Sequence, residues 1–154
     1  MSIEITGLEE VQAQLTNLSR SLTPSAMGRK MHTIGNKVSN VIEDAFEDER
    51  SPFGQSWQPR KRTRRGQSTK VLRKSGDLSD RWLVHATPNQ VEVSNNIAWY
   101  GIIHQEGTSS AGRRRNAVIP ARPFLPIDQS GRLEPTLLRE IKEYLDEEIE
   151  GVLR

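Results

Sequence analysis

The segment YGIIHQEG, residues 100–107, places a histidine and a carboxylate two residues apart, at His104 and Glu106. On a β-strand, residues i and i+2 point to the same side, so this pair offers two ligands for a metal ion. The other histidines, His32 and His85, lie far away in the sequence, and no spacing supplies a third ligand. The alternative is a half-buried His104 whose ring nitrogens bond to backbone groups, and the sequence favours it.

Sequence patterns of catalysis are missing as well. The chain has no Gly-x-Ser-x-Gly nucleophile elbow and no glycine-rich loop ending in Lys and Ser or Thr. It also has no cysteine, which excludes disulfides and thiolate metal sites. We therefore expect no enzyme activity and no cofactor.

Basic residues form two groups that are able to neutralise phosphates, because bound Lys and Arg release counterions from nucleic acid. The first group lies in residues 51–76, which contain no acidic residue. The two groups consist of Arg60, Lys61, Arg62, Arg64 and Arg65, and of Arg113, Arg114 and Arg115. Three interpretations stay open for them: contact with DNA, a solvated loop, and contact with acidic helices of a neighbouring subunit. No aromatic residue lies among these arginines, which argues against recognition of single strands by base stacking.

The composition indicates one domain, residues 1–154, with a thin core. Only 34% of the 154 residues are hydrophobic and 27% are charged. A core of this kind favours burial of further surface against copies of the chain or a partner. The formal net charge is only +2, so its distribution is more informative than its total. We expect neither secretion nor a membrane span, because no apolar run approaches the roughly 20 residues that a span needs.

Apolar periodicity predicts three helices. The first covers residues 8–22, and Thr23 as N-cap with Pro24 at the first helical position begins a second helix that runs to about Glu49. The last 20 or so residues form the third. The stripes of the first and third helices are Leu8, Val11, Leu15, Leu18 and Leu22, and Leu138, Ile141, Leu145, Ile149 and Val152.

Between these helices the sequence predicts a small antiparallel sheet. WLVHAT and QVEVS form a hairpin, and VLRKSGDLSDRWL forms a short helical turn. The segment NNIAWYGIIHQEG stays open between strand and helix. Residues 51–70 and 107–117 are predicted as long loops, and the proline-rich residues 118–127 as an extended arm. The fold class is therefore α+β: an N-terminal helical hairpin, a small antiparallel sheet with long loops, and a C-terminal helix.

Three segments form an ordered pattern: SPFGQSWQPRK, then VLRKSGDLSDRW, then YGIIHQEGT followed by IPARPFLPI. Together they resemble the phage virion-morphogenesis family, the Mu-like and tail-completion proteins of phage necks and tails. The resemblance covers about residues 51–127. It rests on Pro52, Gly54, Trp57, Pro59, Leu72, Ser75, Gly76, Leu78, Tyr100, His104, Gly107, Ile119, Pro120, Arg122, Pro123, Phe124 and Leu125.

The resemblance implies a structural component of a tailed-phage neck or tail, as a tail completion protein, tail terminator or head-tail connector. It implies an oligomeric ring, a hexamer or dodecamer, that contacts other neck and tail proteins while the genome passes transiently. The protein would be assembled in the host cytoplasm and located in the virion. The alternative is a sequence-independent DNA-binding protein.

The resemblance also implies a subunit or partner interface on the proline-rich arm and the segments around it. We expect the ring of Phe124 to anchor in a pocket of a neighbouring subunit. The interface residues are Trp57, Tyr100, His104, Pro120, Arg122, Pro123, Phe124 and Leu125.

Overall fold

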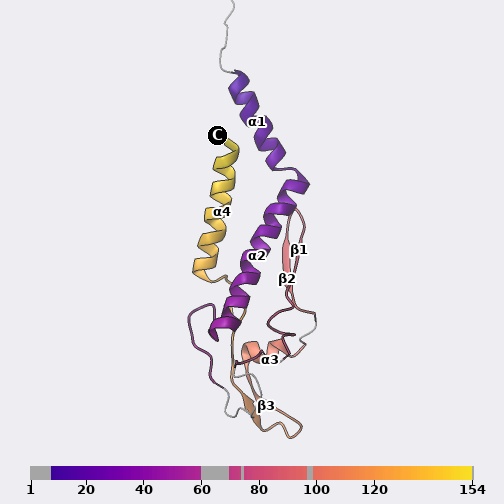
Figure 1. The fold of residues 1–154 in the computed structure, drawn as a ribbon, viewed down its shortest axis with the longest axis vertical. Helices are drawn as coiled ribbons and strands as arrows, with labels where there is room; N and C mark the ends of the chain where they lie inside the picture. The colour runs from indigo at the N-terminus through magenta and orange to yellow at the C-terminus, as the bar shows by residue number, and fades with distance from the viewer. Residues whose placement is uncertain (1–7, 60–69, 74, 97–98, 154) are drawn as a thin grey trace, which may run out of the picture.

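The computed structural model describes residues 8–59, 70–73, 75–96 and 99–153, with the backbone alone at 8–10 and 153. Helix α2 (Pro24–Asp48) runs through the middle of an elongated molecule, with α1 (Leu8–Ser21) beyond its N-terminal end (Figure 1). Helix α4 (Pro135–Leu153) lies along one side of α2 and runs in the opposite direction.

The helical hairpin at the N-terminus follows from local signals. Thr23 has an extended backbone, its side chain accepts a hydrogen bond from the Ala26 N–H at 3.4 Å, and Pro24 begins the helix. Helix α2 ends at Glu49, whose left-handed backbone (φ 53°) directs its N–H to the Ala45 carbonyl. The predicted helices over residues 8–22 and 24–49 are confirmed.

Strands β1 (Leu83–Ala86) and β2 (Val91–Ser94) form the predicted antiparallel hairpin, which packs against α2. Gly35 on α2 makes this packing possible. A Cβ atom at position 35 would lie 2.4 Å from Cγ1 of Val84 and 2.7 Å from Cγ2 of Val91. The hairpin therefore rests directly on the helix backbone.

Helix α4 packs against the other side of α2, where Leu137 and Ile141 cluster with Ile34. Only part of the predicted stripe is buried, because Leu138 and Ile149 are 39% and 53% exposed and Leu137 takes the central position instead. The carboxylate of Glu134 begins the helix by accepting the N–H groups of Thr136 at 2.9 Å and Leu137 at 2.7 Å. Burial acts to raise the pKa of Glu134, but these hydrogen bonds together hold it below its ordinary value. The predicted C-terminal helix is confirmed.

The region beyond the C-terminal end of α2 contains a short helix and a second hairpin. The segment left open between strand and helix contains α3 (Gly101–Glu106). The segment 107–117, predicted as a long loop, instead contains β3 (Thr108–Ala111), which pairs with β4 (Ala117–Ile119). The α+β class is confirmed, but in the described residues the small sheet is two separate sheets of two strands each.

Candidate assembly site

The extended arm, residues 118–127, is bound along its length to segments far away in the sequence. The indole N–H of Trp57 donates to the Pro123 carbonyl at 2.9 Å. The guanidinium of Arg122 donates twice to the Gln58 carbonyl, from Nε at 3.0 Å and from Nη2 at 2.9 Å. Arg122 is only 8% exposed, so these bonds also satisfy a buried cation. The arm is thus fixed to the loop that follows α2.

Helix α3 binds the opposite edge of the arm. The side-chain oxygen of Gln105 accepts the N–H groups of Phe124 at 2.9 Å and Leu125 at 3.1 Å. The backbone N–H of Arg122 donates to the His104 carbonyl at 2.7 Å. One side chain thereby supplies the hydrogen bonds that a second strand would give the arm, which suits a segment interrupted by prolines.

Phe124 lies in the core of this chain. Its ring is 3% exposed, with its centroid 5.2 Å from that of Phe46 and 5.9 Å from that of Trp82. Trp57 packs edge-on against Phe46 at 5.4 Å. This placement corrects the expected anchoring of Phe124 in a neighbour's pocket, because the site that receives the ring belongs to its own chain. Trp57 and Arg122 are buried in the same way and brace the arm rather than face a partner.

Gly107 allows the arm to pass close to the end of α3. Its backbone (φ 73°, ψ 173°) lies in a region that is essentially restricted to glycine. A Cβ atom there would lie 2.6 Å from the Ala121 nitrogen and 3.0 Å from the Ile119 carbonyl oxygen. The glycine of the third family segment therefore serves both the turn and the contact.

The loop after α2 is ordered by backbone hydrogen bonds. Trp57 N–H donates to the Glu49 carbonyl at 2.8 Å, and Ser51 N–H donates to the Gln55 carbonyl at 2.7 Å. The Glu49 carboxylate accepts the N–H of Val71 at 2.5 Å, which joins this loop to the second family segment. All three segments of the sequence pattern thus meet around the arm.

His104 is half-buried, as the favoured alternative predicts, but the bond to a backbone group that this alternative expected of its ring nitrogens is not made at Nδ1 within the described ranges. Its ring packs edge-on against Tyr100 at 5.9 Å, and its Nδ1 atom is buried without a hydrogen-bond partner among the described residues. Burial, and secondarily the positive charge of Arg122, lower the pKa of His104. Because α3 is a helix, His104 and Glu106 point about 200° apart rather than to one side. The described ranges bring together no group of three or more His, Asp or Glu side chains that could hold a metal ion.

The remaining predicted interface residues, Tyr100, Pro120, Pro123 and Leu125, are half-buried. The arginines of the second basic group, Arg113, Arg114 and Arg115, are exposed in the turn that joins β3 and β4, which we name the basic tip. Of the first group, Arg60, Lys61, Arg62, Arg64 and Arg65 lie outside the described residues.

Basic residues just after the first group pair with α2 of their own chain. Lys70 and Arg73 both bind the carboxylate of Glu47. Hydrogen bonds from Lys70 first, and from Arg73, lower the pKa of Glu47. The acidic end of α2 is therefore partly neutralised within the chain.

A family model supplies the comparison with known proteins. The model of the phage virion morphogenesis family matches residues 6–150. The chain belongs to the phage virion morphogenesis family. No curated protein and no solved structure matches it.

Family membership gives a structural role in building the virion, a location in the virion and contacts with other virion proteins. The matched range extends well beyond residues 51–127, on which the resemblance rests, and includes α2 and most of α4. Each described helix is too short or too polar to cross a membrane.

Two residues that brace this virion morphogenesis protein were missed by the sequence pattern: Gln105 and Glu49. Gln105 lies between two candidate metal ligands, and Glu49 is the last residue of an acidic run. The neighbours of Gln105 suggested a metal site, and Glu49 lies outside the three segments of the pattern. Their positions could have identified them. A polar residue at a helix end next to a proline-rich segment is well placed to accept hydrogen bonds from backbone N–H groups.

Proposed function

We propose that this chain is a subunit of a closed ring in the neck or tail of a tailed phage, where it joins or completes the tail without catalysing a reaction. Within this role the chain is a tail completion protein, tail terminator or head-tail connector. Its partners are further copies of itself and neighbouring neck and tail proteins.

The separation of charge along the molecule carries this proposal. The hairpin of β3 and β4, with the basic tip, lies at the end of the molecule remote from α1, whereas α4 lies beside α2 in the other half (Figure 1). The acidic residues of α4 are exposed: Glu140, Glu143, Asp146, Glu147 and Glu150. Opposite charges that lie on different parts of one chain attract between copies in a head-to-tail manner. Head-to-tail contacts generate rings when the rotation closes.

The braced arm supports the same role. Its hydrogen bonds to Trp57, Gln58 and Gln105 hold the base of the β3–β4 hairpin against the core. A rigid base keeps the basic tip at a fixed distance from α4. Contact geometry that is fixed in each copy gives the same rotation between all neighbours, and a ring of defined size forms where that rotation closes.

Charge reversal tests the proposal. We expect Arg113→Glu, Arg114→Glu and Arg115→Glu together to abolish oligomers of the purified protein, measured by light scattering at low salt. Reversal of Glu140, Glu143 and Glu147 to Lys should do the same. A mixture of the two triple variants should restore association, because each then offers the other an opposite charge.

The same variants distinguish the DNA-binding alternative, which the exposed arginines of the basic tip keep open. Contacts with phosphates would give the unmodified protein submicromolar, sequence-independent affinity for duplex DNA that falls steeply as salt rises. We expect weak binding, because long-lived phosphate contacts would hinder passage of a genome. Strong DNA binding that is lost on reversal of the tip, with oligomers and particles unchanged, would favour the alternative.

A further inference from the structure

Helix α1 exposes part of its apolar stripe; Leu18 is half-buried, and Leu22 lies directly after the helix. Val11, Leu15 and Leu22 are 51%, 60% and 58% exposed. Leucines at these spacings form one continuous face of a helix. An exposed apolar face of this kind marks an interaction surface.

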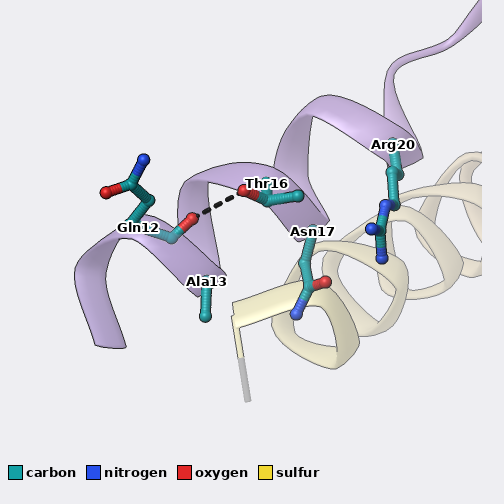
Figure 2. Close-up of a pocket in the computed structure, with 5 residues that line it drawn as sticks. All are labelled: Gln12, Ala13, Thr16, Asn17 and Arg20. Atoms are coloured by element: carbon teal, nitrogen blue, oxygen red, sulfur yellow. Dashed lines mark hydrogen bonds between the residues drawn. The ribbon is translucent and has the colours of Figure 1, made fainter. Parts of the chain in front are cut away.

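The chain itself contacts the opposite face of α1. Figure 2 shows Ala13, Asn17 and Arg20 pointing from α1 towards the C-terminal end of α4. These positions lie about 140–200° around the helix from Leu15. Asn17 and Arg20 also line a gap together with Tyr144 and Glu148 of α4. Val11 and Leu15 thus point away from the chain, whereas Leu18 of the same stripe is half-buried.

A groove elsewhere on the molecule is lined by apolar side chains that could receive this apolar face. It has a volume of about 800 Å³ and lies between the turn after α2 and the first half of α4. Phe53, Leu133 and Leu138 line it, and Phe53 and Leu138 are each 39% exposed. Partly exposed apolar side chains beside a groove suit an amphipathic helix that lays its apolar face into it.

Charge favours α1 as the occupant of this α4 groove. Basic residues Arg132, Arg139 and Lys142 also line the groove, and α1 begins with the sequence Leu-Glu-Glu. One of the described lining residues is acidic, Asp128, and it binds Ser130 and Arg132 in its own loop. Arg139 lies 3.8 Å from Glu143, so Lys142 carries most of the positive excess of the groove. The acidic start of the α1 sequence and the positive excess of the groove are complementary in charge.

We propose that the apolar stripe of α1 in one copy docks into the α4 groove of the next copy. The inference rests on the proposed ring and names a second pair of surfaces within it. In Figure 1, α1 lies at one end, the start of α4 in the middle and the β3–β4 hairpin at the other end. A shift that brings α1 of one copy to the groove of the next also brings the second copy's basic tip towards α4 of the first. One arrangement therefore serves both contacts.

Engineered cysteines test this docking cleanly, because the 154 residues of the chain include no cysteine. Leu15→Cys and Leu138→Cys proteins are prepared separately, mixed and oxidised with a copper catalyst. We expect a cross-linked dimer only in the mixture. Ala13→Cys, on the face of α1 that is turned to α4, is the matched control and should give no dimer with Leu138→Cys. Leu15→Glu should remove oligomers of the otherwise unmodified chain.

Each result decides between named arrangements. Cross-linking of Leu15→Cys with itself would show that two α1 helices pair symmetrically and would overturn the inference. Oligomers that form and respond to reversal of the basic tip, but without a cross-link between positions 15 and 138, would overturn the docking of α1 while leaving the ring intact. A protein that stays monomeric at all concentrations would overturn both.

Discussion

At the scale of single residues, Gly107 has both a positive φ and too little space for a side chain. We predict that Gly107→Ala lowers the free energy of unfolding by about 3 kcal/mol or more, because the new methyl group is strained by its backbone angles and meets the arm. Chemical denaturation measures this loss. Gly131→Ala is the control: Gly131 also has a positive φ (78°), but nothing lies within 4 Å of its added Cβ.

The control separates strain from contact. Gly131→Ala should lower stability by only about 1–2 kcal/mol, the ordinary effect of a left-handed alanine. Equal losses for the two variants would mean that the approach of the arm to Gly107 contributes nothing.

His104 makes the stability of the folded chain sensitive to acid. Its pKa is lowered in the folded chain, whereas an unfolded histidine titrates at about 6.5. Between these two values the unfolded chain binds a proton that the folded chain does not. We therefore predict that the free energy of unfolding falls as pH drops below about 6.5, until the lowered pKa is passed.

Denaturation at a series of pH values between neutral and mildly acidic tests this sign. His104→Gln should lose this part of the pH dependence, and an NMR titration of the imidazole should show the lowered pKa directly. Stability that rises on acidification through this interval, or an unchanged profile in His104→Gln, would contradict the placement of His104.

At the scale of elements, the arm acts as part of the core. Phe124→Ala should destabilise the folded chain by about 3–5 kcal/mol, the usual effect of removing a buried aromatic ring. Val118→Ala, in β4 at the start of the arm, should change stability by less than about 0.5 kcal/mol because Val118 is 66% exposed. Thermal unfolding compares the two. A Phe124→Ala protein that keeps wild-type stability but fails to form oligomers would contradict this, because Phe124 would then act at the interface between subunits.

The contact of α2 with the β1–β2 hairpin offers a second test within one helix. Gly35→Ala should destabilise by about 1–3 kcal/mol, since its Cβ overlaps Val84 and Val91. Gly28→Ala should instead stabilise by about 0.5–1 kcal/mol, because nothing lies within 4 Å and alanine favours a helix. The same sign for both substitutions would contradict the close packing of the hairpin.

The sequence predicts the elements whose signals are local. Thr23 and Pro24 mark the start of α2, and the alternation in QVEVS marks a strand. The β3–β4 hairpin was missed because Thr-Ser-Ser-Ala has weak strand propensity and pairs only with the segment that follows the basic tip.

The residues of the candidate site were predictable from the sequence, but the surface against which they pack was not. The sequence pattern brought Trp57, Arg122 and Phe124 together. Their burial depends on packing between segments 64 to 66 residues apart along the chain, as in the bonds of Arg122 to Gln58 and of Trp57 to Pro123. Pattern alone does not distinguish a conformationally restricted arm that docks on a neighbour from one that docks on its own core.

At the scale of the whole molecule, three exposed surfaces are available for contacts with partners. Most of the described residues in the family segments form or contact the arm within their own chain. The basic tip, the acidic residues of α4, and Val11 and Leu15 of the α1 stripe are exposed instead. A chain with 34% hydrophobic residues that still exposes leucines on α1 has apolar surface to bury by association. We therefore expect assembly to depend on these surfaces more than on the segments that define the family.

A reconstruction of the mature virion by electron cryomicroscopy tests the central claim most directly. We predict density for several copies of the chain in a closed ring in the neck or tail, with the basic tip of each copy against α4 of the next. Particles that contain no copy of the chain, or that hold it as single copies without contact between chains, would contradict the account.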